Sequence, residues 1–292
     1  MNDSTTTRRL LRGDWLALSV ILVATLLTYA PMIHSIVQLS TRTTQAVNAF
    51  VLLAIAVVDA VRVNRGAGRW APQVNDHGVL LYGAACLVLA AASFADLWPM
   101  AVLALILNLA ALLSFCYGRE GVRAFYPALI GLGLAVAMVL LVPQFDRVLR
   151  LVAGGLSARI LSVLGENARV IVRPEPFGVA LIVAGSSKVF NVATECNGLG
   201  IMLSAVVLTA ILAIRRKYPW LLTAALLPVA LGRGLVCNTL RIVAISLASM
   251  ALPWPYGLIH EGVGTLVYCG ALLAVYGLTV LSGRWRARRL PA

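Results

Sequence analysis

The sequence predicts an all-α membrane protein, a polytopic bundle of about eight transmembrane helices with a small extracytoplasmic segment of an amphipathic helix and a β-hairpin. Three observations predict it: the composition, the long apolar stretches and the distribution of basic residues. Of the 292 residues, 61% are hydrophobic and 12% are charged, and the mean hydropathy is +0.91. A soluble domain is nearer half apolar and a quarter charged. These values exclude a soluble globular enzyme, a disordered protein and a nucleic-acid-binding module.

The apolar stretches give the expected spans. A helix that crosses a bilayer needs roughly 20 mostly apolar residues. Eight stretches qualify, at about 14–33, 46–62, 78–97, 99–117, 124–142, 197–214, 219–240 and 262–282. Residues 8–33 also resemble a secretory signal peptide, but the apolar run is long and no small-Xaa-small site follows near Ala30. We therefore expect an uncleaved first span.

The basic residues predict that both termini face the cytoplasm. With the N-terminus inside, more than half of the 24 Lys and Arg fall in inside segments, whereas the outside loop at 34–45 holds only Arg42. The inside residues are Arg8, Arg9, Arg12, Arg62, Arg65, Arg69, Arg119, Arg123, Arg215, Arg216, Lys217, Arg284, Arg286, Arg288 and Arg289. The net charge of +13 is thus a signal of cell-membrane topology and not of a nucleic-acid partner. Five Cys and three His suggest neither a disulfide framework nor a metal site, and we expect no cofactor.

One long segment, about 143–195, is expected outside the membrane on the far side. From Arg147 to Gly165, apolar residues recur at helical spacing, which is typical of an interfacial amphipathic helix. The β-branched runs that follow are broken by Pro and Gly and predict two or three short strands, in a hairpin on the membrane. No internal repeat is evident, so residues 1–292 are treated as a single domain.

Topology brings three reactive residues to the outer face. Cys196 begins the sixth span at its outer end. From Tyr218 to Arg241 a helix rises roughly 34 Å, about one membrane core, and His260 stands at the outer start of the last span. A helix N-terminus and a cation favour a thiolate, and a His can carry the proton of a leaving amine. The trio suits acyl transfer through a thioester; separate structural roles are the alternative.

Three short strings resemble the exosortase/archaeosortase family of membrane transpeptidases: TECNGLGIML, NTLRIVA and HEGVG. That family has a Cys followed closely by Gly at a helix start, then Asn-Xaa-Xaa-Arg, then His with Gly four residues later. The matching positions are Cys196 with Gly198, Asn238 with Arg241, and His260 with Gly264. The motif-bearing core covers about 165–282. Asn197 departs from the Ser that often follows the family's Cys, which leaves the nucleophile in place.

The resemblance implies a cysteine peptidase or transpeptidase of the cytoplasmic membrane. Its partners would be exported proteins with a PEP-CTERM-like C-terminal signal, which has a Pro-containing motif, a transmembrane helix and a basic tail. The acyl group would pass to an unidentified acceptor. Cys196 would be the nucleophile, Arg241 the stabiliser of the substrate carbonyl or the thiolate, and His260 the acid and base.

Two further residues have alternative interpretations. Glu195 is either a solvated loop residue or a group that orients His260 or Arg241. Arg233 lies about two turns deeper than Arg241, and it either pairs with an intramembrane acid or carbonyl group or contacts the substrate helix.

The alternative function is a non-enzymatic membrane protein, a small transporter or an assembly scaffold. A transporter site would place polar residues at mid-membrane, whereas the strongest polar cluster here is expected at one surface. A metalloprotease helix would need a second His after His260-Glu261, and none follows.

Overall fold

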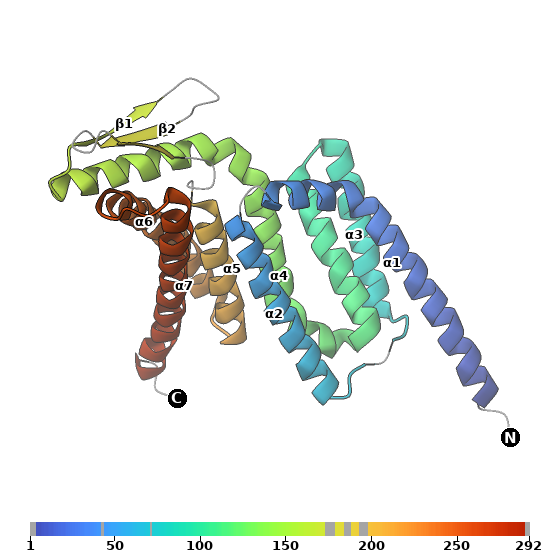
Figure 1. Ribbon diagram of the computed structural model, residues 1–292. Coiled ribbons are helices and arrows are strands. Elements are labelled where there is room, and N and C mark those ends of the chain that lie inside the picture. Colours follow the sequence, from blue (N-terminus) through green and yellow to red (C-terminus); the bar gives the residue numbers. More distant parts are fainter. Residues whose placement is uncertain are drawn as a thin grey trace. The chain divides into compact units, whose positions relative to one another are not determined.

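The computed structural model describes residues 4–41, 44–70, 72–172, 179–183, 188–192 and 198–289. Its backbone is mainly helical, with one small antiparallel sheet (Figure 1). The chain divides into two compact units. The N-terminal unit comprises residues 1–38 and 53–137, and the C-terminal unit comprises residues 39–52 and 138–292. Each unit is described by itself below.

The N-terminal unit is built from α1 (Ser4–Thr41), most of α2 (Thr44–Gly66), α3 (Asp76–Ala95) and the first part of α4 (Trp98–Val163). Phe115 of α4 is buried with Leu18 of α1, and Leu81 of α3 packs against both. Asn75 fastens the start of α3, because its side chain accepts a hydrogen bond from the Gly78 amide at 2.8 Å and donates one to the Ser114 carbonyl at 2.7 Å. This cap ties α3 to α4 at one end of the unit.

A single glycine divides α4. Gly118 has φ 68° and ψ 174°, a conformation that breaks the helix and that side-chain-bearing residues rarely adopt. The chain reverses there (Figure 1), and Ala110 before the break packs in one cluster with Val122 and Phe125 after it. The two expected spans at 99–117 and 124–142 therefore correspond to the two arms of one continuous element.

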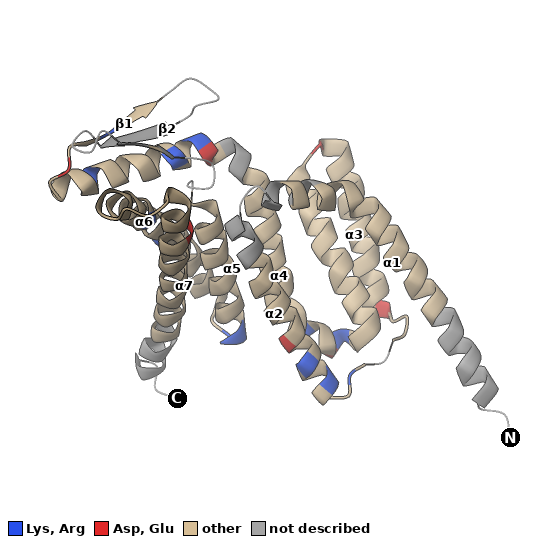
Figure 2. Cartoon of the chain, in the orientation of Figure 1, with Lys and Arg blue, Asp and Glu red and all other residues tan. Residues whose placement is uncertain are grey.

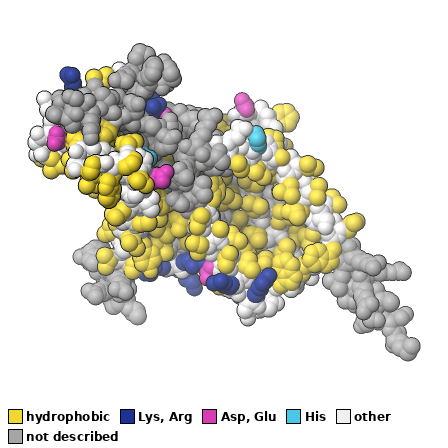
Figure 3. Space-filling model, viewed as in Figure 1, with side chains coloured by type: hydrophobic (Ala, Val, Ile, Leu, Met, Phe, Trp, Pro, Cys, Tyr) yellow, Lys and Arg dark blue, Asp and Glu magenta, His cyan; other side chains and the backbone are white. Residues whose placement is uncertain are grey.

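Among the described residues, five helical segments are long and apolar enough to cross a membrane: Trp15–His34, Asp76–Ala95, Trp98–Leu141, Trp220–Ala251 and Tyr256–Leu281. Apolar side chains cover the flanks of the helices in Figure 3, as lipid-facing helices require. The expected count of eight is not reproduced, for physical reasons. The 44-residue segment covers two expected spans, and the apolar helix at 199–215 is too short. In α2, the helical turns that follow Asp59 also carry Arg62 and Arg65.

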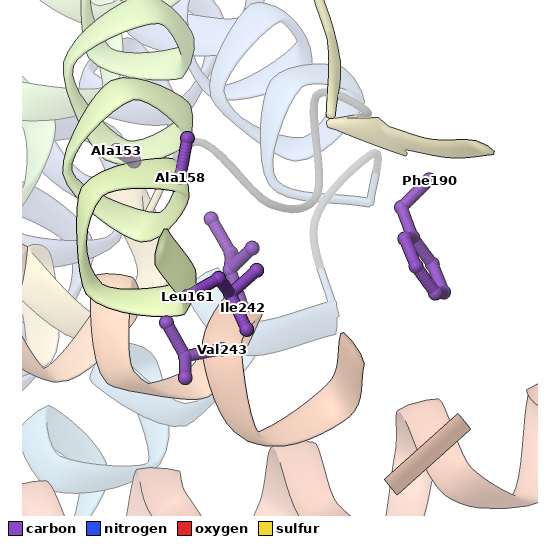
Figure 4. Packing of buried hydrophobic residues seen from close by; sticks show 6 residues of the cluster. All are labelled: Ala153, Ala158, Leu161, Phe190, Ile242 and Val243. Carbon is purple, nitrogen blue, oxygen red and sulfur yellow. The ribbon is translucent and has the colours of Figure 1, made fainter. Parts of the chain in front are cut away.

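The last part of α4 in the C-terminal unit, residues 146–163, is helical where the sequence predicts an amphipathic helix. Ala153 and Leu161 lie on one buried face and pack against Ile242 and Val243 of α6 (Trp220–Ala251), as Figure 4 shows. Ser157 on the same face donates to the Thr239 carbonyl at 3.3 Å. This segment of α4 is therefore held along the second half of α6.

Three short strands follow, in the segment for which two or three were expected. They are β1 (Ala168–Val172), β2 (Val179–Val183) and β3 (Lys188–Val192), and they form an antiparallel sheet in the order β1-β2-β3. Leu181 pairs with Val170 on one side and with Phe190 on the other. Phe190 joins the cluster formed by α4 and α6, so the sheet packs on the helices through this aromatic ring.

The remaining helices, α5 (Leu199–Arg215), α6 and α7 (Tyr256–Arg289), pack against one another (Figure 1). Gly234 of α6 lies directly on the backbone of α5, because a Cβ atom at this position would come within 2.7 Å of the Met202 Cα. Small residues allow helices to approach this closely in membranes. The contact fixes the spacing of α5 and α6 beneath the positions that the sequence singles out.

The adjacent glycines of α6 provide a test of this packing. Gly234→Ala should lower the free energy of unfolding by about 1–3 kcal/mol, because the added methyl group overlaps the backbone of α5. Gly232→Ala is the control, since nothing lies within 4 Å of its Cβ position, and it should raise stability by about 0.5–1 kcal/mol through helix propensity. Thermal unfolding in detergent measures both. Equal shifts would contradict the close approach of α5 and α6.

Candidate active site

Arg241 and His260 meet in the C-terminal unit. Arg241 lies on α6 and is only 3% exposed, and its Nη2 is 3.4 Å from Nε2 of His260 in the first turns of α7. A guanidinium has only donors. The His260 Nε2 atom is therefore the acceptor in this contact, and a neutral His260 carries its proton on Nδ1. The geometry leaves an unprotonated ring nitrogen beside a buried cation.

Gly264 makes room for this guanidinium. It lies one turn after His260 on the same face of α7, and a Cβ atom at Gly264 would stand 3.0 Å from the Arg241 Nε. The spacing of four residues between His and Gly thus has a steric cause. His260 contacts the guanidinium through its ring, and Gly264 lets α7 pass close to the guanidinium.

The start of α5 packs closely against Asn238. Asn238 lies three residues before Arg241 on α6, and it is 0% exposed. A Cβ atom at Gly198 would stand 2.7 Å from its Cγ. Gly198 is also the N-cap of α5 and has φ 84°, in the left-handed region that favours glycine. One face of α6 therefore holds the start of α5 at Asn238 and the first turns of α7 at Arg241.

Cys196, Glu195 and Asn197 lie outside the described residues, which resume at Gly198. The expected convergence is therefore described for two of its three members. Arg241 and His260 come together, at 3.4 Å. The distance from Cys196 to either residue and the role of Glu195 stay predictions.

The sequence reasoning missed an aromatic ring next to His260. Tyr256 is 49% exposed, and its ring centroid lies 5.7 Å from that of His260. The ring of Phe190 of β3 lies in turn 6.5 Å from the ring of Tyr256. The spacing of four residues between Tyr256 and His260 on one helix was the available signal. The ring of Tyr256 limits the orientations that the imidazole can adopt.

Arg233 is partly buried on α6, two turns before Arg241. Within the described ranges it makes no ion pair, since the salt bridges there join Arg123 to Glu120 and Arg150 to Asp146. The interpretation that it pairs with an intramembrane acid therefore finds no support in these ranges.

The family comparison matches most of the chain. The model of the protein family described as transmembrane exosortase matches residues 40–277. This range includes Gly198, Asn238, Arg241, His260 and Gly264. No curated protein and no solved structure matches the chain.

The glycines of α7 provide a test of the site geometry. Gly264→Ala should displace the Arg241 guanidinium from His260, and misplacement of a catalytic group by about 1 Å can cost on the order of 100-fold in rate. Gly262→Ala is the control, because its Cβ position has nothing within 4 Å. Processing of a secreted reporter with a C-terminal sorting signal, normalised to the protein level, measures the effect. Equal activity of the two variants would show that the space left by Gly264 for the Arg241 guanidinium is unimportant.

Proposed function

Because the chain belongs to the transmembrane exosortase family, we propose that this multi-pass membrane protein is a cysteine-type peptidase or transpeptidase. The observation that carries the proposal is the part-buried contact between Arg241 and His260. A carrier or scaffold has no evident use for an imidazole held with one nitrogen unprotonated against a guanidinium. A cysteine enzyme uses a base to activate its nucleophile, and a nearby cation favours the thiolate.

In the proposed reaction, Cys196 is the nucleophile and His260 is the base that takes the thiol proton on Nε2. The Nε2 atom gives up its contact with Arg241 in this step, which frees the guanidinium N–H groups. The thiolate attacks the carbonyl carbon of the scissile peptide bond, and the N–H groups of Arg241 stabilise the oxyanion that forms. The intermediate collapses to a thioester, and the leaving amine takes the proton from His260. An acceptor nucleophile, or water, then attacks the thioester and gives its proton to His260. The Cys196 sulfur leaves as a thiolate, and the proton on His260 returns to it.

The distribution of charge supports a site at the outer face of the cytoplasmic membrane. Arg215, Arg216 and Lys217 lie at the end of α5 opposite Gly198. Figure 2 shows basic residues at this end of the helix. Basic loops of membrane proteins face the cytoplasm, so the start of α5 would face outward and both termini inward. Exported proteins with a Pro-containing motif, an apolar helix and a basic tail would be the substrates.

Replacement of Cys196 tests the nucleophile. Cys196→Ala and Cys196→Ser should both abolish processing of the reporter while the protein still accumulates, because neither hydrogen nor hydroxyl replaces a thiolate at neutral pH. A membrane-impermeant maleimide added from outside should modify wild-type Cys196, identified by mass spectrometry. Normal processing by Cys196→Ala would favour the scaffold alternative.

Arg241→Lys separates two roles of the cation. If Arg241 holds the oxyanion with its planar fork of donors, Lys should restore little activity, because its charge sits on a flexible stem. We expect this outcome, with a loss of about 100-fold or more in kcat. Arg241→Ala is the reference. Near-normal kcat in Arg241→Lys would show that only the positive charge matters, for example in lowering the pKa of the Cys196 thiol.

A further inference from the structure

A buried hydrogen bond joins α5 to α7 below the candidate site. The Tyr268 hydroxyl donates to Ser204 Oγ at 2.8 Å. Ser204 is 0% exposed and Tyr268 is 6% exposed. Apolar neighbours surround the pair, since Ile201 and Ala271 pack with Tyr268 in one cluster. Such surroundings make an unpaired hydroxyl costly.

The two helices run in the same direction, so this bond sets how far one is shifted along the other. Ser204 and Tyr268 join the first halves of α5 and α7, and Tyr218, just after α5, donates to the Thr279 carbonyl further along α7 at 2.8 Å. Tyr268 lies eight residues after His260, or about 12 Å along α7, and Ser204 lies six residues after Gly198, or about 9 Å along α5. The bond therefore holds the start of α5 nearly level with the first turns of α7.

Apolar packing alone fixes this shift less strictly. The burial of apolar surface is non-directional, whereas a hydrogen bond weakens steeply with distance and angle. Gly198 and His260 must both reach the same face of α6, at Asn238 and Arg241. A slip of α7 against α5 would move His260 relative to the helix that Cys196 precedes.

We propose that Ser204 and Tyr268 are positioning residues for the cysteine chemistry, and that their hydrogen bond sets the axial alignment of His260 with the start of α5, the helix that follows Cys196 in the sequence. This inference rests on the proposed function. Neither side chain contacts the substrate. Their loss should therefore lower kcat and leave KM unchanged.

The test compares two hydroxyl deletions of the same kind. Tyr268→Phe removes the bond below the site, and Tyr218→Phe removes a bond of the same length to α7 at the end far from the site. The substrate is a secreted reporter that ends in a Pro-containing motif, an apolar span and an Arg-rich tail. We expect Tyr268→Phe to lower kcat about tenfold or more with KM unchanged. Tyr218→Phe should stay within about twofold of wild type in kcat, and it should lower the thermal midpoint less than Tyr268→Phe, because its hydrogen bond is only part-buried.

Variants of Ser204 separate alignment from stability. Ser204→Ala should reduce kcat as Tyr268→Phe does, because it removes the same hydrogen bond. The double variant Ser204→Ala/Tyr268→Phe leaves no orphaned hydroxyl, so it should fold at least as well as either single variant. It should nonetheless have a kcat no higher than theirs, because the two changes break the same bond.

The outcomes distinguish the two levels of inference. A wild-type kcat in the double variant would overturn the positioning role. So would a loss of kcat that is in proportion to the fall in thermal midpoint in both Tyr268→Phe and Tyr218→Phe. If those results occur while Cys196→Ala is inactive, the proposed function stands without it. Activity in Cys196→Ala would overturn the proposed function and the positioning role together.

Discussion

The C-terminal unit is organised around a cation that is almost completely removed from solvent. A buried guanidinium needs hydrogen-bond acceptors and close, well-shaped surroundings. Arg241 obtains them where α6 meets the first turns of α7, with His260 in contact and Gly264 leaving space. The positions of three motifs follow from this one requirement, because α6 must also receive the start of α5 on the same face, at Asn238.

Close helix packing gives this arrangement its rigidity. Gly234 allows α6 to touch the backbone of α5, and the buried bond between Tyr268 and Ser204 joins α5 to α7. The last part of α4 adds a further support through Leu161 and Ser157, which contact α6 just after Asn238 in sequence. Arg241 and His260 are thus held by packed helices, which favours a fixed geometry of these two groups.

The sequence predicted the features that depend on hydropathy and chain direction. Long apolar runs identified α1, α3, α6 and α7, and counting along α6 brought Arg241 to the level of His260. Features that depend on side-chain packing were not predictable. The bond between Ser204 and Tyr268 joins residues 64 apart that carry no motif. The gap between the expected spans at 99–117 and 124–142 contains the reversal, but hydropathy does not show that a single residue, Gly118, makes it.

The length of α5 has a consequence for the electric field around Arg241. Its 17 residues extend about 26 Å, less than the roughly 30 Å of a bilayer core. Its first turn meets α6 at Asn238, and α6 continues to Ala251. Helix α6 thus extends beyond the level at which α5 begins, and the Arg241 side chain is only 3% exposed there. The charge of Arg241 therefore acts through protein and not through bulk water, and its field on neighbouring groups is stronger than it would be at a hydrated surface.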